Sequence, residues 1–390
     1  GSGTINAAGF VNNNFTTANI SVNRFNIGAS GISRASGTIN LDGTTIGALA
    51  DWSTGAPLVL ASTSTFDTLN ATDGVTPQSV TLSGGVSGSG GLTKAGGGTL
   101  TLSAASPFSG AAEITGGTLR VSNTLRGVSS MTVSNAATLE LGATNIFVAG
   151  HGAALDAGRV LTANASTLLM NSAMNSRIGN VTLNDGSVWT SDRALTAYDV
   201  LLANVSTGAA TVTVSGNGPS VMNGSGGIHL QGVQNFDVAE TTGNRGADLT
   251  VSMTLAAQGI SGGDAGGVNK LGTGTMTLLA APSYTGETIV NAGTLQLGDN
   301  SATGAITGTS PTSTLGGGGT VTVNFGSTLS ANNAIGTGVS YLANTLTGFG
   351  TLEIAGAGHF GLSGNTNTFG GTVAMKSSGQ VYGGLTLDYT

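Results

Sequence analysis

The stretch that decides the fold is GLTKAGGGTLTLSAASPFSGAAEITGGTLRV, residues 91–121. It contains two runs in which polar and aliphatic side chains alternate, TLTL at 99–102 and TLRV at 118–121. Such alternation is typical of a β-strand with one buried and one exposed face. Gly and Ser surround both runs, and these residues suit tight turns. The stretch therefore predicts short, half-buried strands joined by turns.

A second copy of this stretch lies in the C-terminal half of the chain. It reads GVNKLGTGTMTLLAAPSYTGETIVNAGTLQL at residues 267–297, and it aligns without a gap, with 13 of 31 positions identical. Phe108 of the first copy corresponds to Tyr284 of the second. We expect a third, degenerate copy at 346–376. The pattern indicates true internal repeats, which are the signature of a solenoid.

Stacking explains how such repeats can be stable. The apolar face of one repeat is too small to be buried alone, but neighbouring coils can cover it. Only 7% of the residues are charged, which fits stacking because like charges one above the other would repel. The sequence thus predicts an all-β solenoid, a parallel β-helix with the form of an elongated rod, over residues 86–390. Residues 1–85 are poorly repetitive and are expected to form the N-terminal part of the solenoid or a cap.

Composition excludes several classes of protein. The net charge is −7 with 11 Lys and Arg, and these are not clustered, which argues against nucleic acid binding. The chain has no Cys, so disulfides and thiolate metal sites are excluded. The longest span without a charged residue, 301–352, is rich in Gly, Thr, Ser and Asn, so no transmembrane helix is expected. Gly1-Ser2-Gly3 is not a secretory signal, and we expect the chain to be a fragment of a longer protein.

The two repeats resemble the autotransporter-associated β-strand repeat of bacterial autotransporter passenger domains. The family pattern runs G-x-L-x-K-x-G-x-G-T-L-T-L, then an aromatic residue and G-T-L, and Lys94 to Val121 and Lys270 to Leu297 carry most of it. The resemblance implies a right-handed parallel β-helix that is secreted from, or exposed on the surface of, a Gram-negative type of bacterium. It also implies a translocating outer-membrane β-barrel as a partner outside this chain.

Candidate catalytic residues are scarce. Gly150-His151-Gly152 resembles one element of polygalacturonase-like hydrolases, but no Asp-Asp pair and no Arg-x-Lys accompanies it. His229 and His359 are isolated and have no metal-ligand spacing. We therefore predict no catalytic, cofactor-binding or metal-binding residue and expect no cofactor.

Other polar patterns are equally weak as site signals. Asp185, Asp192 and Asp199 are evenly spaced at a distance much shorter than one coil, which spreads them around it and predicts solvated turns. Gly262-Gly263-Asp264 approaches a calcium-binding nonapeptide but does not repeat. The Thr-x-Thr pairs could suggest an ice-binding face, but they lie at irregular distances and imply no flat lattice: Thr99/Thr101, Thr211/Thr213, Thr275/Thr277 and Thr320/Thr322.

The functional expectation is a non-enzymatic surface protein. We expect an adhesin, a stalk or a self-associating filament element, whose partner is a second copy, a surface glycan or a host-cell ligand. Two alternatives remain open, a polysaccharide lyase or hydrolase whose site assembles from distant residues, and an inert spacer. A groove holding two carboxylates about 5–10 Å apart would favour the enzyme.

Overall fold

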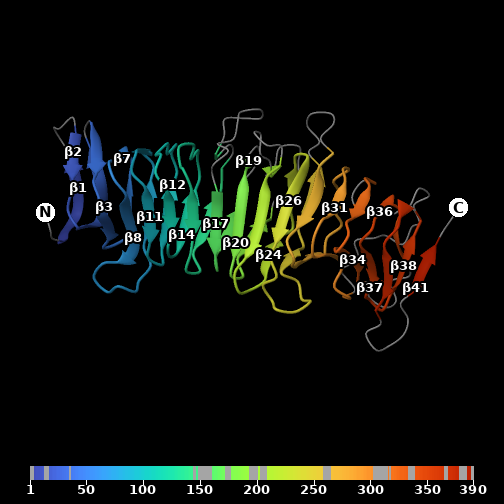
Figure 1. The fold of residues 1–390 in the computed structure, drawn as a ribbon. Coiled ribbons are helices and arrows are strands. Elements are labelled where there is room, and N and C mark those ends of the chain that lie inside the picture. Colours follow the sequence, from blue (N-terminus) through green and yellow to red (C-terminus); the bar gives the residue numbers. More distant parts are fainter. Residues whose placement is uncertain are drawn as a thin grey trace. The chain divides into compact units, whose positions relative to one another are not determined.

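The computed structural model describes residues 4–12, 17–34, 37–143, 146–147, 160–171, 177–192, 201–202, 209–257, 265–301, 315, 318–332, 339–363, 368–376 and 384–387. These residues form β-strands and turns, and none of them is in a helix. The chain divides into two compact units, Gly1–Arg177 and Ile178–Thr390 (Figure 1). Each unit is a parallel β-solenoid, as the repeats predicted.

The first unit has three stacks of parallel strands. The first stack is β1 (Thr4–Asn12), β3 (Arg24–Arg34), β5 (Thr45–Ala48), β8 (Ser64–Asn70), β11 (Leu92–Ala95), β13 (Ala112–Ile114), β15 (Met131–Val133) and β17 (Val160–Asn164). The second is β6 (Trp52–Thr54), β9 (Ser79–Leu82), β12 (Thr99–Leu102), β14 (Thr118–Val121), β16 (Thr138–Leu141) and β18 (Thr167–Met170). The third is β2 (Thr17–Ile20), β4 (Thr38–Leu41), β7 (Leu58–Leu60) and β10 (Val86–Gly88). The described part of residues 1–85 thus consists of strands with the same parallel pairing.

The second unit repeats this arrangement, and β19 (Arg177–Ile178) spans the boundary between the units. Its first stack is β20 (Asn180–Asn184), β23 (Thr211–Ser215), β26 (Val233–Val238), β29 (Gly267–Leu271), β31 (Thr288–Val290), β33 (Val321–Val323), β36 (Leu346–Gly348) and β39 (Thr368–Phe369). Its second is β21 (Val188–Ser191), β24 (Ser220–Asn223), β27 (Leu249–Val251), β30 (Thr275–Leu278), β32 (Thr294–Leu297), β34 (Thr328–Ala331), β37 (Thr351–Ile354) and β40 (Thr372–Met375). Two short stacks complete it, β22 (Leu201–Leu202), β25 (Gly227–Leu230) and β28 (Thr254–Ala257), and β35 (Val339–Leu342), β38 (His359–Leu362) and β41 (Gly384–Leu387).

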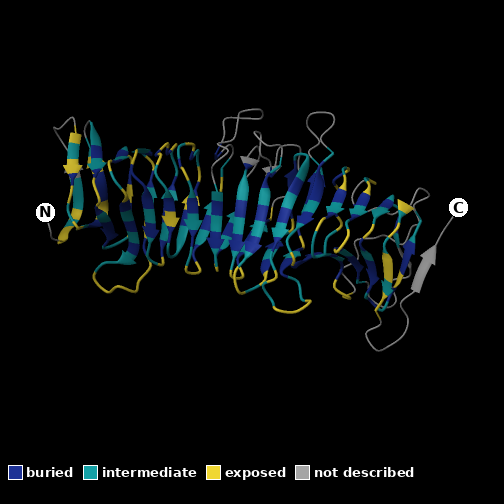
Figure 2. Ribbon diagram, in the orientation of Figure 1, coloured by how far each residue is buried: buried dark blue, intermediate teal, exposed yellow. Residues whose placement is uncertain are grey.

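Stacked aliphatic side chains hold the coils in register. Leu100, Leu119, Leu139 and Leu168 lie directly above one another in β12, β14, β16 and β18, and each is completely buried. Figure 2 shows that buried segments recur along the strands of each unit. Burial of each such side chain contributes about 1.5–3 kcal/mol. The last two leucines are further apart in sequence than the first two, yet they pair in the same register. The core therefore fixes which residues stack, whatever the coil length.

The polar face of the same strands is also in register. Thr99, Thr118, Thr138 and Thr167 form one row across β12, β14, β16 and β18. The first residue of each of these strands is thus opposite its counterpart, although the strands are unequally spaced in the sequence.

An asparagine ladder links coils of the second unit. Asn269 donates to the side-chain oxygen of Asn235 at 2.9 Å, and Asn291 donates to that of Asn269 at 2.6 Å. Asn324 donates in turn to Asn291. Each amide has both a donor and an acceptor, so asparagines of successive coils can bond to one another. Asn291 does so from just beyond the end of β31, since Asn269 is paired in register with Ile289. The ladder stabilises the outer face without introducing charge.

Candidate functional site

The lysine of each repeat is a buried structural group. Lys94 is completely buried, and its ammonium donates to three backbone carbonyls, those of Ala95 (2.9 Å), Gly96 (2.7 Å) and Gly116 (2.7 Å). Three donors therefore meet three acceptors, which compensates the cost of burying a charge. Because Ala95 and Gly96 lie in one coil and Gly116 in the next, the ammonium joins two coils.

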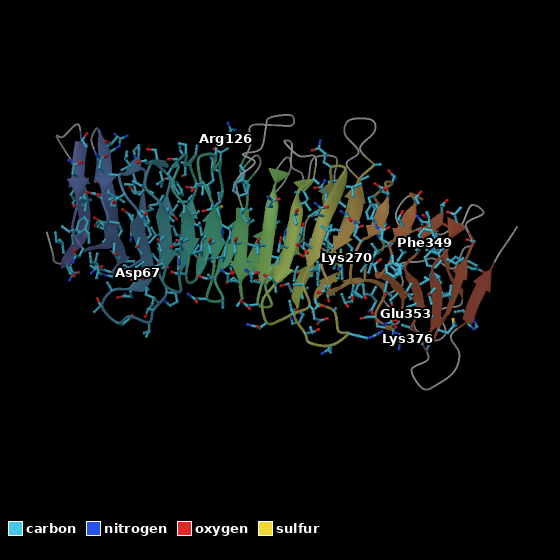
Figure 3. The ribbon with its side chains drawn as sticks, in the orientation of Figure 1. Asp67, Arg126, Lys270, Phe349, Glu353 and Lys376 are labelled. Atoms are coloured by element: carbon cyan, nitrogen blue, oxygen red, sulfur yellow. The ribbon has the colours of Figure 1, made fainter. Side chains whose placement is uncertain are left out.

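Lys270 makes the same contacts in the second repeat (Figure 3). Its ammonium donates to the carbonyls of Leu271 (2.7 Å), Gly272 (2.9 Å) and Ala292 (3.2 Å), and the side chain is completely buried. The backbone of Gly272 has a φ of 71°, and Gly96 in the first repeat has a φ of 76°. Non-glycine residues rarely adopt this conformation, so the glycine two positions after each lysine is needed to place its carbonyl at the ammonium.

Burial also changes the protonation of these lysines. It lowers the pKa of Lys94 to about 8, and the negative charge of Asp67 acts in the opposite direction. It lowers the pKa of Lys270 to about 8 as well, opposed by Asp237 and Asp248. Asp67 is paired in register with the residue after Lys94, and Asp237 with the residue after Lys270. Each repeat thus rests on a coil that supplies a carboxylate close to the buried ammonium.

The aromatic residue differs between the two repeats, and the residue that contacts it in the second repeat differs as well. Tyr284 is completely buried, and its hydroxyl is 2.7 Å from the Oγ1 atom of Thr288, which is also buried. The corresponding residues of the first repeat are Phe108 and Ala112, both buried and both without a hydroxyl. A buried hydroxyl needs a hydrogen-bond partner. The repeat with tyrosine therefore also has threonine, and the repeat with phenylalanine can have alanine.

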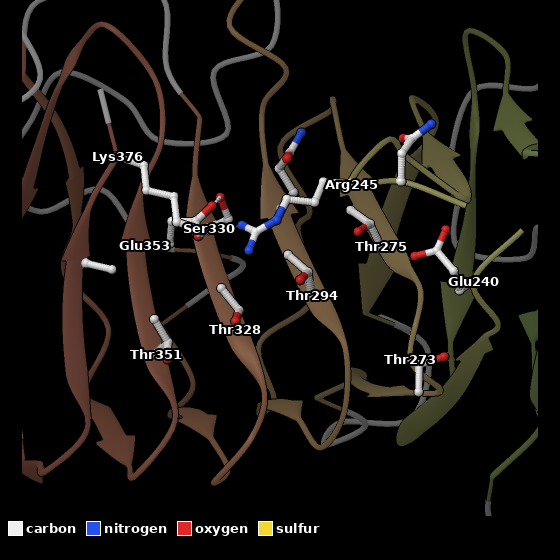
Figure 4. Close-up of a pocket in the computed structure, with 13 residues that line it drawn as sticks. Glu240, Arg245, Thr273, Thr275, Thr294, Thr328, Ser330, Thr351, Glu353 and Lys376 are labelled. Atoms are coloured by element: carbon white, nitrogen blue, oxygen red, sulfur yellow. Dashed lines mark hydrogen bonds and ion pairs between the residues drawn. The ribbon is translucent and has the colours of Figure 1, made fainter. Parts of the chain in front are cut away.

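A polar groove lies on the outer face of the second unit. It has a volume of about 350 Å³, and polar side chains form all but one of its lining positions (Figure 4). The groove crosses β30, β32, β34, β37 and β40, so it runs from coil to coil. Its lining residues are Glu240, Asn244, Arg245, Thr273, Thr275, Thr294, Gln296, Thr328, Ser330, Thr351, Glu353, Ala374 and Lys376.

Two rows of side chains form the floor of this groove. Thr294, Thr328 and Thr351 are in register at the first position of their strands. At the third position of the same strands, Gln296, Ser330 and Glu353 form the second row. The groove floor therefore repeats its hydrogen-bonding groups once per coil, at the strand spacing of about 4.8 Å.

A cluster of charges lies at one part of the groove. The Oε2 atom of Glu353 accepts from Arg245 at 3.2 Å and pairs with Lys376, and its Oε1 atom accepts from the Ser330 hydroxyl at 3.3 Å. The Glu353 side chain is only 12% exposed, whereas that of Arg245 is 81% exposed. Both carboxylate oxygens are thus engaged, while most of the guanidinium faces solvent.

Arg245 reaches Glu353 from a loop that is remote in sequence. This loop, residues 239–248, joins β26 to β27, and buried Asp248 holds it. Asp248 accepts from the Thr241 amide and hydroxyl, at 2.7 and 2.9 Å, from the Thr242 amide at 2.9 Å and from the Thr275 amide at 2.7 Å. Burial acts to raise the pKa of Asp248, but these hydrogen bonds outweigh it and hold the pKa below its usual value.

Exposed aromatic residues precede two of the groove strands. Phe349 is 72% exposed and comes shortly before Thr351, and Phe325 is 88% exposed and comes shortly before Thr328. Val323 and Gly348 are paired in register, so the two phenylalanines follow neighbouring strands. We call Phe325 and Phe349 the aromatic edge.

The structure places few of the sequence candidates near one another. His229 is buried, with its Nδ1 atom 2.7 Å from the Ala257 carbonyl, and His359 is exposed. Asp185 accepts from the Asn217 amide and Asp192 from the Ser225 amide, so both hold turns of the next coil. His151, Asp199 and Gly262-Gly263-Asp264 lie outside the described residues.

Two absences hold for the described part of the chain. It contains no group of three or more His, Cys, Asp or Glu side chains that could hold a metal ion. None of its segments forms a helix able to cross a membrane.

The sequence analysis missed the groove and the lysines. A signal for the lysines existed, because Lys94 and Lys270 occupy the inward-facing parity of the alternation in β11 and β29. No signal connects Arg245 with Glu353, since only the folded chain brings these residues together.

A known protein family matches the same two segments that the sequence analysis identified as repeats. The family described as Passenger-associated-transport-repeat matches residues 92–121 and 268–297, which are the segments that contain the two buried lysines. The third copy, expected at 346–376, stays a prediction. No match to the chain was found among curated proteins or among solved structures. Proteins with this repeat are generally surface-exposed or secreted. The chain therefore carries two passenger-associated transport repeats, which are typical of the passenger domains of autotransporters.

Proposed function

We propose that this chain is the non-enzymatic, ligand-binding part of an extracellular passenger, and that it acts as an adhesin of a Gram-negative type of bacterium. The observation that carries this proposal is the polar groove of the second unit, about 350 Å³ in volume, with exposed Arg245 at its rim. A solenoid face offers such a site a rigid support, because its lining side chains sit on strands or on an anchored loop.

The state of the groove carboxylates supports binding over catalysis. Glycosidic bond cleavage by a carboxylate pair needs one group that can donate a proton and another that can accept one or attack. Glu353 has both oxygens engaged by Arg245, Lys376 and Ser330. Only Glu240 remains as a second carboxylate among the lining residues, and it is exposed.

Display on a surface makes weak sites effective. When many copies of a protein face many copies of a ligand, the second contact forms at a high effective concentration, and avidity exceeds the affinity of one site. A groove of this size can therefore support adhesion without a tight pocket. A self-associating element and an inert stalk are the other non-enzymatic roles that remain compatible with the repeats.

Three measurements on the purified protein test this proposal. We expect saturable binding of the fluorescently labelled protein to cultured epithelial cells or to Gram-negative cells. We expect no new reducing ends or unsaturated products from pectin, alginate or heparan sulfate, and no change of sedimentation coefficient with concentration. Release of products from any of these polymers would overturn the non-enzymatic proposal. Absence of cell binding together with concentration-dependent assembly would replace the adhesin by a structural element.

A further inference from the structure

The two phenylalanines of the aromatic edge are unusually exposed for aromatic side chains. Phe325 and Phe349 keep 88% and 72% of their surface accessible, although aromatic side chains are normally placed where they lose contact with water. The Phe349 ring lies against Gly370 of the next coil, since a Cβ atom at Gly370 would be 2.9 Å from its Cε1 atom. Glycine at this position thus leaves room for a ring that leans along the direction of stacking.

The aromatic edge and the groove floor are close in the chain, and both run from coil to coil along the stacking direction. Phe349 is separated from Thr351 by a single residue, and the chain bends at 349–350 between the end of β36 and the start of β37. The threonine row and the aromatic residues both follow successive coils, at the strand spacing of about 4.8 Å. This spacing is close to the advance of one sugar ring in an extended polysaccharide. A chain of sugars laid across the strands would therefore present one ring to each coil.

The two surfaces match the two sides of a sugar ring. Hydroxyl and amide groups of Thr328, Thr351 and Gln296 can both donate and accept hydrogen bonds, as sugar hydroxyls require. Aromatic side chains provide a flat apolar surface for the C–H groups of a ring. A protein partner would instead need a larger and drier apolar patch.

The charge of the groove indicates a neutral polymer. The lining side chains include two cations, Arg245 and Lys376, and two anions, Glu240 and Glu353, so their formal charges cancel. The whole chain carries a net charge of −7, which disfavours the approach of an acidic polymer. Arg245 still offers N–H donors that Glu353 does not use, because the guanidinium has five.

We propose that the groove and the aromatic edge together bind an extended neutral polysaccharide, which runs across β32, β34 and β37 with one sugar ring per coil. This inference rests on the adhesin proposed above and names the chemical class of its ligand. Thr294, Thr328 and Thr351 bond to ring hydroxyls, and Phe325 and Phe349 stack against the rings.

Calorimetric titration of the whole chain with defined oligosaccharides tests this site. The probes are cellohexaose, mannohexaose and a galactan hexamer as neutral chains, and hexagalacturonate as the acidic chain. We expect at least one neutral hexamer to bind, with an affinity that changes little between low and high NaCl, and hexagalacturonate to bind more weakly.

Variants of exposed residues test whether the oligosaccharide binds at the groove and the aromatic edge. Phe349→Ala should weaken binding roughly three- to tenfold through loss of stacking, and Thr328→Val should weaken it about two- to tenfold through loss of a hydroxyl. Thr138→Val is the matched control, because Thr138 has the same strand position and partial exposure but lies in the first unit. It should leave the affinity unchanged.

The failures of the two proposals can be told apart. If the protein binds cells but no neutral hexamer, or if both groove variants bind like the wild type, the polysaccharide site is wrong and the adhesin stands. If sedimentation shows a dimer that Phe349→Ala abolishes, the aromatic edge is a contact between copies, and the polysaccharide site is again wrong. Loss of cell binding in every assay removes the adhesin itself.

Discussion

At the scale of single residues, the buried lysines determine how the repeats respond to pH. An ammonium with three carbonyl acceptors is a satisfied group, yet its burial still disfavours the charge, and the pKa of Lys94 and of Lys270 falls to about 8. An unfolded lysine has a pKa near its ordinary 10.5. The folded and unfolded chains therefore bind different numbers of protons between these two pH values.

Stability should rise with pH above about 8. In this window the unfolded chain binds more protons than the folded chain, so raising the pH increases the free energy of unfolding, by about 1 kcal/mol per pH unit for each lysine. Below pH 8 the lysines are protonated in both states and contribute no pH dependence. Burial raises the pKa of Tyr284, which reverses the trend above about pH 10, where unfolded tyrosine ionises.

Urea unfolding followed by circular dichroism at pH 7, 8, 9 and 10 measures this dependence. A variant with both Lys94→Met and Lys270→Met is the control, and it should lose the rise in the urea midpoint. A wild-type midpoint that stays constant or falls between pH 8 and 10 would contradict a lowered pKa.

The Tyr284 hydroxyl should depend on Thr288 alone for its partner. Thr288→Val keeps the shape but leaves the buried hydroxyl unpaired, and we expect a loss of about 1–3 kcal/mol in the free energy of unfolding. Adding Tyr284→Phe removes the unpaired group and should recover most of this loss. A double-mutant cycle by urea unfolding gives the coupling, and additive effects of the two changes would show that the hydroxyls do not interact.

At the scale of elements, one carboxylate anchors the loop that frames the groove. Asp248 accepts hydrogen bonds from Thr241, Thr242 and Thr275, and so connects the loop 239–248 to β30. The loop in turn carries Arg245 to Glu353. The geometry of the groove rim thus depends on a buried group that does not itself line the groove.

Asp248→Asn should release this loop. Neutralising the acceptor weakens several charge-assisted hydrogen bonds, and we expect a loss of about 2 kcal/mol or more in local stability. Hydrogen exchange should accelerate at the amides of Thr241, Thr242 and Thr275. Because the folded pKa of Asp248 is lowered, the same contribution should be present above pH 4 and should be lost as the pH falls through that lowered pKa.

Asp73→Asn is the matched control for this variant. Asp73 accepts from the amides of Val75 and Thr76 in an exposed turn of the first unit. Its replacement should affect exchange only in that turn. Unchanged protection at Thr242 and Thr275 in Asp248→Asn would mean that the loop is held by other contacts.

At the scale of the whole molecule, stability should be local. In a solenoid each coil contacts mainly its neighbours, so the free energy of unfolding behaves as a sum over coils and their interfaces. Lys94 belongs to the first unit and Lys270 to the second, and each joins only adjacent coils. Damage to one repeat should therefore leave the other repeat intact.

Lys94→Met provides the test of this local behaviour. It removes the ammonium donor from the carbonyls of Ala95, Gly96 and Gly116, of which that of Ala95 still accepts from the Thr68 hydroxyl, and we expect a cost of about 2–4 kcal/mol. Hydrogen exchange should accelerate across residues 92–121 and remain unchanged across 268–297. Lys376→Met removes an exposed lysine and should cost less than about 1 kcal/mol. Equal acceleration in both repeats would show that the chain unfolds as one cooperative body.

The sequence by itself determined the parallel β-solenoid and the positions of two repeats. Alternation with a period of two specifies which side chains face inward, and the strands predicted at 99–102 and 118–121 are confirmed as β12 and β14. One sequence pattern recurs in two distant segments, so both segments were expected to form the same structure. The family match falls on these two segments. These features are local or periodic, so a single chain displays them directly.

Only the tertiary structure decided the groove. Thr294, Thr328 and Thr351 are separated by unequal stretches of sequence, yet they pair in register in the folded chain. The ion pair of Arg245 with Glu353 joins two residues that no repeating pattern in the sequence relates to each other. Stacking of the aliphatic core sets the register of the coils, and the polar face follows that register. The surface chemistry is therefore a consequence of core packing, which sequence spacing alone does not reveal.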